Sequence, residues 1–470
     1  MAQERGSENP DQPSLPTRPV GGTEYGWCKA VPGGTGSTVL SLLLSKPPQI
    51  PHLQNALHKL QISHPILRSK IHFDTTTNTF QFVTPPNPRV QIQPFDLQST
   101  SQILQTQAND HDSIDPFHAL LEHEMNRDTW RDPNDVDVMY ASTYTIDEKR
   151  FAVFLRLHTS VCDRAAAVAL LKELLRLVAG RGGEDGGGGE VKGGEKVNLA
   201  IEDLIPEGKK NKPFWARGFD VLGYSLNAFR FSNLSFVNAD PPRSSRIVRL
   251  QLNADETKRL LDGCKSRGIK LCAALAAAVM LATWISKRLP DYQTEKYAVV
   301  TLMDCRRLLD PVLPSSHCGF YHSAILNTHD VSGESLWELA KRSYASFENA
   351  VNYNKHFSDM SDLNFLMCKA IDNPGLTPSS SLRTALVSVF EDLVIDESTE
   401  MHEELGLEDY LGCASAHGVG PSLAMFDAIR NGKLDCACIY PSPLHSREQI
   451  QGLVDHMKRI LVDGCNSENQ

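Results

Sequence analysis

The sequence has no excess of positive charge and no long hydrophobic run. It contains 47 basic and 57 acidic residues, for a net charge of −10, which argues against nucleic acid as the main partner. The most apolar segment, 271–285, is too short to cross a bilayer and is interpreted as a buried core helix. Residues 1–19 are polar and proline-rich, which argues against a secretory signal there and predicts a disordered tail. We therefore expect no membrane partner.

The sequence also lacks the cysteine and histidine spacings of a metal site. Its eleven cysteines are an odd number and lie scattered in apolar segments, and only one residue separates Cys436 from Cys438. This pattern predicts buried thiols in a reducing compartment, not a disulfide framework. We expect no metal ion and no bound cofactor, and a cytoplasmic location.

A glycine-rich segment at 33–36 has two interpretations. It could be a phosphate-binding loop, but no Lys-Ser or Lys-Thr pair follows it, and an apolar run at 39–44 comes next. A turn that leads into a strand is therefore the favoured prediction.

Periodicity predicts alternating helices and strands along the chain. Leu53, Ala56, Leu57 and Leu60 lie on one face of a helix within 51–69. Strands are predicted at 70–74 and 79–83 as a hairpin. After residue 246 the pattern gives a strand, a helix capped by Asn253 or Asp255, and the buried helix at 271–285. Near the end, Asn431-Gly432 predicts a tight hairpin, and a final helix follows.

The strongest site signal lies in residues 151–178. An apolar run at 151–157 predicts a buried strand, and apolar positions at helical spacing in 168–178 predict a helix directly after it. Between the two lie His158, Thr159, Ser160 and Asp163. Polar side chains at the end of a strand lie at a sheet edge, where a ligand can approach.

Residues 158–163, HTSVCD, resemble the HHxxxDG motif of the chloramphenicol-acetyltransferase-like superfamily. This superfamily includes condensation domains, plant BAHD acyltransferases, alcohol acetyltransferases and mycobacterial polyketide-associated acyltransferases. In it, the second motif histidine is the general base and the aspartate is structural. His158 and Asp163 match the first histidine and the aspartate. Thr159 replaces the base, and Arg164 replaces the motif glycine.

The resemblance extends, as architecture, from about residue 20 to 462, and includes the LxxALxxLxxxHPxLR pattern of the first helix. It implies an α/β (α+β) fold of two mixed-sheet sandwich domains around a central channel. The expected divisions are a first domain at 20–180, a flexible glycine-rich insertion at 181–196, a crossover at 197–245 and a second domain at 246–470. The aromatic segment 213–236 would be a tunnel wall or, as we favour, interdomain packing. The BAHD signature DFGWG is absent, so the chain looks closer to the condensation and alcohol-acetyltransferase branch.

The resemblance also implies an interdomain ion pair. Residues 297–310 read as a strand that runs into an Asp-x-Arg-Arg cluster, and Arg306 best matches the superfamily arginine that pairs with the motif aspartate, here Asp163. The alternative is that Arg306 and Arg307 are solvated loop residues.

The change at Thr159 affects the expected chemistry directly. A neutral hydroxyl is too weak to act as a base, although it could donate a hydrogen bond to an oxyanion. His158, His417 and, after them, His322 are the candidate replacement bases, although for each of them a structural role is the favoured interpretation. Cys162 as a nucleophile is disfavoured because no Cys-His-Asp order supports it.

Two functional hypotheses follow from the resemblance. The first is a CoA-thioester-dependent acyltransferase that acts on a small alcohol or amine, with acyl-CoA as co-substrate and the protein as a monomer. A free CoA thioester is expected because the sequence shows no carrier-protein domain. The second is an altered or inactive member of the fold that binds a small molecule, serves as a scaffold or catalyses a different reaction.

Overall fold

The computed structural model describes residues 16–107, 114–132, 134–180, 198–212, 231–290, 292–396 and 399–466. The predicted insertion at 181–196 and most of the aromatic segment 213–236 lie outside these residues. So do residues 1–15 of the predicted tail. Residues 17–19 of that tail are instead a short strand, β1 (Thr17–Pro19), because their backbone pairs with β4 (Thr79–Val83).

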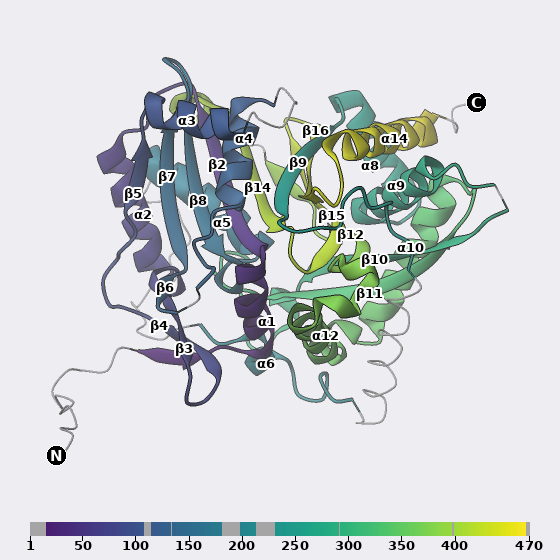
Figure 1. Ribbon diagram of the computed structural model, residues 1–470, viewed down its shortest axis with the longest axis horizontal. Coiled ribbons are helices and arrows are strands. Elements are labelled where there is room, and N and C mark those ends of the chain that lie inside the picture. Colours follow the sequence, from purple (N-terminus) through teal and green to yellow (C-terminus); the bar gives the residue numbers. More distant parts are fainter. Residues whose placement is uncertain are drawn as a thin grey trace.

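Two large mixed sheets dominate the molecule and lie beside each other in Figure 1. The first has the order β14-β2-β8-β7-β5, and the second has the order β11-β10-β12-β15-β16-β9 with β13 beside β15. A smaller sheet has the order β1-β4-β3-β6. The fold is thus α/β in two mixed-sheet parts, as the sequence predicted. The remaining strand bounds are β2 Thr35–Leu44, β3 Lys70–Asp74, β5 Ile92–Phe95, β6 Val136–Asp137, β7 Met139–Thr145, β8 Phe151–His158, β9 Ser244–Gln251, β10 Glu295–Asp304, β11 His322–Val331, β12 Arg383–Phe390, β13 Val394–Asp396, β14 Leu407–Ala416, β15 Gly420–Arg430 and β16 Lys433–Ser442.

Helices cover both faces of the first sheet. Alternate residues of β2 point to opposite faces. Leu40 and Leu42 join a core with α2 (Ile50–Ser63) and α5 (Arg164–Val178), whereas Val39 and Leu43 join a core with α4 (Pro116–Met125). A strand buried on both faces is expected to be largely apolar, which explains the run VLSLLL in β2. The remaining helices are α1 Gly22–Ala30, α3 Leu97–Gln107, α6 Ile201–Leu204, α8 Ala254–Ser266, α9 Leu271–Ser286, α10 Leu336–Asn352, α11 Lys355–Ser358, α12 Met360–Asp372, α13 Thr399–Leu405 and α14 Arg447–Asn466.

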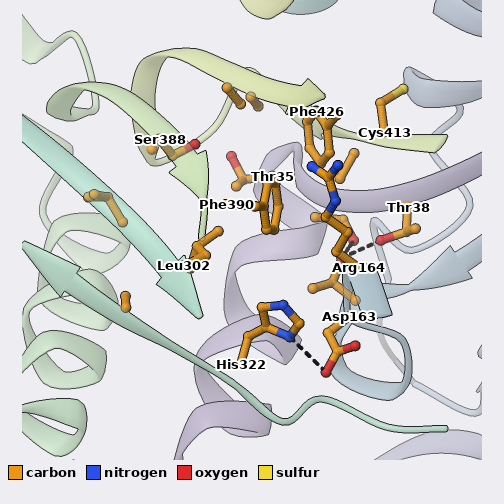
Figure 2. A pocket seen from close by; sticks show the side chains of 18 of the residues that line it. Thr35, Thr38, Asp163, Arg164, Leu302, His322, Ser388, Phe390, Cys413 and Phe426 are labelled. Carbon is orange, nitrogen blue, oxygen red and sulfur yellow. Dashed lines mark hydrogen bonds and ion pairs between the residues drawn. The ribbon is translucent and has the colours of Figure 1, made fainter. Parts of the chain in front are cut away.

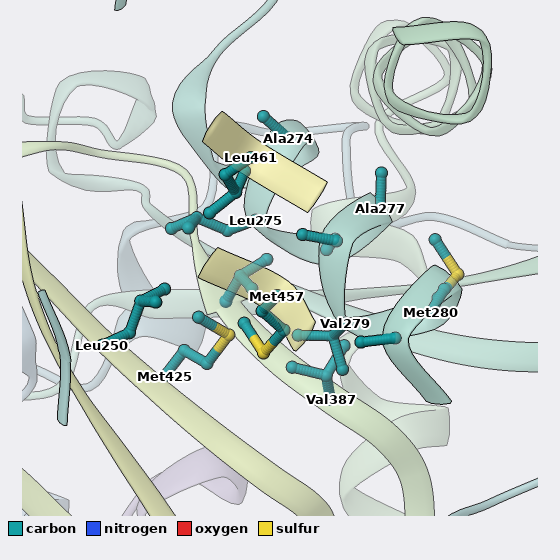
Figure 3. Close-up of a cluster of buried hydrophobic side chains, with 14 of the residues drawn as sticks. Leu250, Ala274, Leu275, Ala277, Val279, Met280, Val387, Met425, Met457 and Leu461 are labelled. Carbon is teal, nitrogen blue, oxygen red and sulfur yellow. The ribbon is translucent and has the colours of Figure 1, made fainter. Parts of the chain in front are cut away.

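The second core is built around α9, which is apolar on every side. Figure 3 shows Leu275 and Val279 of this helix beside Met457 and Leu461 of α14, and Val387 of β12 lies below them. Fourteen of the helix's sixteen residues are buried, which explains why the segment has no polar face. The predicted core helix at 271–285 is confirmed.

Local signals in the sequence placed several elements correctly. The hairpin β3–β4, the turn at Asn431-Gly432 and the Asn253 cap of α8 are all present, and Glu256 completes a capping box with Asn253. Gly34, with φ +96°, ends a short helical turn before β2, as the favoured interpretation of the glycine-rich segment required. These features depend on contacts between residues a few positions apart.

One strand crosses the expected domain boundary. β14 belongs by sequence to the predicted second domain at 246–470, yet it pairs antiparallel with β2 in the first sheet, from Leu407 opposite Leu44 to Ala416 opposite Thr35. The boundary at residue 246 therefore does not separate the two sheets. The position of β14 is determined by its backbone hydrogen bonds with the fully buried strand β2. The apolar periodicity within β14 cannot predict that β2 is its partner.

Three compositional predictions concern the cysteines, metal ligands and membrane-spanning helices. All eleven cysteines lie in described residues and are free thiols, nine of them buried. No cluster of three potential metal ligands occurs among the described residues. Within the described ranges no single helix is long and apolar enough to span a membrane. Only α8 and α9 taken together, bent by 107°, meet the length and composition criteria.

Candidate active site

A cavity of about 700 Å³ lies between the two large sheets. Its walls come from β2, α5 and β14 on one side and from β10, β11, β12 and β15 on the other, and α12 contributes further residues. Figure 2 shows that aromatic side chains such as Phe390 and Phe426 project into it beside the charged residues Asp163 and Arg164. The lining is mostly apolar, which suits a hydrophobic ligand with few polar groups.

Asp163 is fixed by charges and hydrogen bonds from both halves of the molecule. Its Oδ2 lies 3.0 Å from Arg306 Nη1, and its Oδ1 accepts from Arg306 Nη2 at 3.0 Å. Oδ2 also accepts from the Tyr321 backbone N–H at 2.7 Å, and Oδ1 caps α5 at the Ala166 N–H. Burial opposes ionisation, but Arg306 and His322 hold the pKa of Asp163 well below its usual range. The structure therefore contains the ion pair that the resemblance implied. Arg306 is buried, whereas Arg307 is exposed, as the alternative interpretation required of both arginines.

The Thr159 hydroxyl lines the cavity but is already engaged. Its Oγ1 donates to the Gly36 carbonyl at 2.6 Å and lies 2.8 Å from Thr38 Oγ1. A hydroxyl has a single proton. Because the Gly36 carbonyl receives that proton, Thr159 has none left for an oxyanion in this arrangement.

His158 and His417, the two favoured replacement bases, do not line the cavity. His158 packs edge-on against Trp130, its Nδ1 lies 2.7 Å from Ser160 Oγ, and burial lowers its pKa to about 3. His417 Nδ1 lies 3.0 Å from Ser245 Oγ, and burial together with Arg383 lowers its pKa to about 4. Both histidines have the surroundings of structural side chains.

The other side of His417 is closed by a glycine. A Cβ atom placed on Gly34 would lie only 1.9 Å from His417 Nε2. Gly34 also has a φ of +96°, so both its backbone conformation and this contact require glycine. The glycine-rich turn thus has a packing role against His417.

His322, the third candidate, lies on the cavity wall at the start of β11. Its Nδ1 is 3.1 Å from Asp163 Oδ2, as Figure 2 shows. Nδ1 makes no hydrogen bond of acceptable geometry in the structure, so its contact with the carboxylate is electrostatic. The ring also packs edge-on against Phe390, at 6.0 Å between centroids. Among the described residues that line the cavity, His322 is the only histidine.

Arg164, at the position of the motif glycine, extends into the cavity. Figure 2 shows it pointing toward Phe390 and Phe426, and its guanidinium lies 4.5 Å from the centre of the Phe390 ring. Nη1 is 3.5 Å from the Asp427 carboxylate, and Nη2 donates to the Asp427 carbonyl. Burial raises the pKa of Asp427, and Arg164 opposes that rise. Residues 163 and 164 therefore make separate ion pairs across the cavity.

Cys162 and Thr35 also line the cavity. Burial raises the pKa of the Cys162 thiol well above its usual value, so a thiolate nucleophile is disfavoured, as the sequence suggested. Thr35 Oγ1 is buried without a hydrogen-bond partner among the described residues, and Thr35 lines the cavity. No pattern in the sequence predicts this unpaired hydroxyl.

Comparison with known proteins agrees with this two-part arrangement. No curated protein matches the sequence. A family model described as phthiocerol/phthiodiolone dimycocerosyl transferase C-terminus matches residues 241–362. The trichothecene 15-O-acetyltransferase of Fusarium sporotrichioides has a similar structure over 95% of both chains, with a TM-score of 0.69 at 14% sequence identity. The chain has the fold of the chloramphenicol-acetyltransferase-like superfamily.

Two further structures with this fold cover nearly the whole chain. Polyketide synthase associated protein 5 from Mycobacterium tuberculosis has a TM-score of 0.63 at 17% identity, with 96% of this chain and 98% of that one covered. The X-domain from teicoplanin biosynthesis, in a complex with OxyB, has a TM-score of 0.57 at 16% identity, with 100% and 98% covered. At these identities the shared property is the fold, so the activity must be argued from the cavity itself.

The outcome for the predicted site residues differs from one to the next. The structure brings Thr159, Asp163, Arg306 and His322 together at or beside the cavity and leaves His158 and His417 out of its lining. The sequence analysis ranked His158 first among the replacement bases, and the structure instead buries it away from the cavity lining. No sequence signal could place His322 against Asp163, because the two lie 159 positions apart on different sheets.

Proposed function

We propose that the protein transfers an acyl group from a CoA thioester to an alcohol or amine within this cavity. The single observation that carries the proposal is the apolar cavity of about 700 Å³ between the sheets, with Asp163 fixed at its wall by Arg306. A thioester and an acceptor held together in a water-poor channel gain most of their rate from placement, up to roughly 7–11 kcal/mol. The chain would act with acyl-CoA and a small-molecule acceptor as its partners, as a cytoplasmic monomer.

The residues that line the cavity restrict the kind of acceptor that would fit. Trp27, Phe320, Phe390 and Phe426 supply aromatic surface, and most of the exposed wall area is apolar. Acceptors with an extended apolar body and one hydroxyl or amine fit such a site best.

The experiment measures binding and turnover on the same sample. Calorimetry follows CoA and acetyl-CoA binding, and thiol release follows turnover with acetyl-, malonyl- and aromatic-CoA against a panel of apolar alcohols and amines. Val168→Trp places a large ring in the cavity wall on α5. Arg176→Trp puts the same ring on an exposed position of the same helix and serves as the control.

We expect the wild type and Arg176→Trp to bind CoA and release thiol, and Val168→Trp to lose at least about tenfold in turnover. Failure of the wild type to bind CoA or acetyl-CoA would refute the proposal. Equal turnover in the two tryptophan variants would place the reaction elsewhere.

A specific observation favours a second candidate, a binding or scaffold protein with this fold or one with a different reaction. Thr159 occupies the position of the superfamily's base, and its proton is bonded to the Gly36 carbonyl. Ligand binding without turnover over the whole panel would support this candidate, and the X-domain described above shows the same fold in a protein–protein complex.

A further inference from the structure

We propose that His322 is the general base of this site and takes over the role of the histidine that the motif lacks. The inference rests on the proposed acyl transfer and assigns one of its steps to a residue. It moves the base from the first sheet to the opposite wall of the cavity, on β11.

His322 lies where a general base could reach a bound acceptor. His322 lines the cavity and is 4% exposed, and its ring lies 6.4 Å from that of Phe320 and 6.0 Å from that of Phe390. The aromatic neighbours restrict the ring and keep bulk water from it. A base must reach the proton that it removes, and among the described histidines only His322 lines this cavity.

His322 also contacts the carboxylate of Asp163. The carboxylate cannot move freely, because Arg306 and the Tyr321 N–H fix it, and Nδ1 of His322 lies 3.1 Å away. A small rotation of the ring would align Nδ1–H with Oδ2, and such contacts commonly tighten when substrate binds. A carboxylate on Nδ1 leaves Nε2 unprotonated for the substrate and stabilises the imidazolium that forms.

The step balances without a further reactant. Nε2 of His322 removes the proton of the acceptor hydroxyl while its oxygen bonds to the thioester carbonyl carbon. The tetrahedral intermediate then breaks its carbon–sulfur bond. The imidazolium returns the proton to the departing sulfur, so the products are the ester and free CoA thiol, and His322 is neutral again.

The charged groups around the ring are few. Asp163 and Arg306 face it from the α5 cap and the turn after β10, and Asp304 lies opposite it in the β10–β11 pairing. Arg164, paired with its own carboxylate partner, projects into the same cavity. The His322 ring thus has the Asp163 carboxylate beside Nδ1, and Arg306 forms an ion pair with that same carboxylate.

The test compares His322→Gln with His158→Gln. Both remove a buried imidazole, but only the first changes a residue on the cavity wall. Each variant is assayed with an alcohol acceptor and with hydroxylamine, which attacks thioesters without help from a base. Calorimetry with CoA checks that each variant keeps an intact site, and rates are measured across pH.

We expect His322→Gln to lose about 10²–10⁴-fold in kcat with the alcohol. Its KM for acyl-CoA should change less than about threefold, and its hydroxylamine rate less than about tenfold. The acidic limb of the pH–rate profile, which reports protonation of the base, should disappear in this variant alone.

Alcohol turnover within about threefold of the wild type in His322→Gln would overturn the base assignment, and so would equal losses with the two acceptors. If the wild type itself shows no turnover, the acyl-transfer function fails and the assignment fails with it. The two failures are thus distinguished by the wild-type measurement alone.

Discussion

Replacing Arg306 by methionine should destabilise the protein strongly. The change keeps an unbranched side chain of similar length and removes only the guanidinium. Arg306 is fully buried, and its partner Asp163 is 3% exposed. The ionised carboxylate would therefore stay in the interior without its cation.

The contacts of the Arg306 guanidinium indicate how much stability the substitution removes. The guanidinium makes two contacts of 3.0 Å with Asp163 and one of 2.8 Å with Asp304, and it donates twice to the His317 carbonyl, at 2.9 and 3.1 Å. Removing one partner of a buried ion pair costs about 3–5 kcal/mol, because the remaining charge is uncompensated. Backbone donors such as the Tyr321 N–H still hold the carboxylate, so we expect the lower half of that range.

The assay is urea unfolding near pH 7, followed by circular dichroism and tryptophan fluorescence. Arg131→Met is the matched control, because Arg131 and its partner Asp128 are 79% and 78% exposed, and it should unfold like the wild type. The pKa of Asp163 is held well below its usual range. The pair's contribution is therefore fully present above the unfolded-state pKa near 4 and is lost as pH falls through the folded value. The gap between Arg306→Met and the wild type should be constant from about pH 6 to 8 and should narrow in acid.

Two results would refute this reasoning. One is an Arg306→Met variant within about 1 kcal/mol of the wild type, which is below the range for a buried pair. The other is additivity in the cycle with Asp163→Asn, because contacting residues should couple by more than about 0.5 kcal/mol.

Three further predictions concern the cavity wall. Thr159→Val should cost about 1–3 kcal/mol because it leaves the Gly36 carbonyl unpaired, whereas Thr35→Val, which removes an unpartnered hydroxyl, should be neutral or stabilising; equal losses in urea unfolding would contradict this. Gly36→Ala should also be destabilised, since Gly36 has a φ of +97° and a Cβ there would lie 3.2 Å from Thr159 Oγ1; a midpoint equal to that of the wild type would count against it. Arg164→Met removes the cation that opposes the burial-raised pKa of Asp427, so this pKa should rise further in the folded protein. A carboxyl group whose pKa is higher in the folded than in the unfolded state destabilises the protein as the pH rises from the unfolded-state pKa to the folded-state pKa. The melting temperature of Arg164→Met should therefore fall further below the wild type at about pH 8 than at about pH 5, and a pH-independent difference would argue against the pair.

Prediction from the sequence was accurate where structure depends on near neighbours. The β3–β4 hairpin, the Asn253 cap and the buried helix α9 were predicted because propensity, capping and periodicity act within a few residues. The motif resemblance added the pairing of Asp163 with Arg306, which no local pattern contains.

Prediction was incomplete where distant segments meet. β14 joins the first sheet although most of its sequence neighbours build the second, because it completes the hydrogen bonds of β2. The weight placed on His158 and His417 came from their positions near strand ends, and neither lines the cavity, since Trp130 packs on one ring and Gly34 on the other.

The sequence by itself determined single elements, such as the β3–β4 hairpin, the helix α9 and the strand β8 with the changed motif at its end, because local propensity and apolar periodicity are properties of single segments. The arrangement in two sheets came from the resemblance to the superfamily. Only the tertiary structure decided which polar groups share the cavity. His322 on β11 approaches Asp163 to 3.1 Å, and Arg164 reaches Asp427 on β15 across the cavity between the two sheets. The chemistry of the site depends on these through-space contacts between residues more than 150 positions apart.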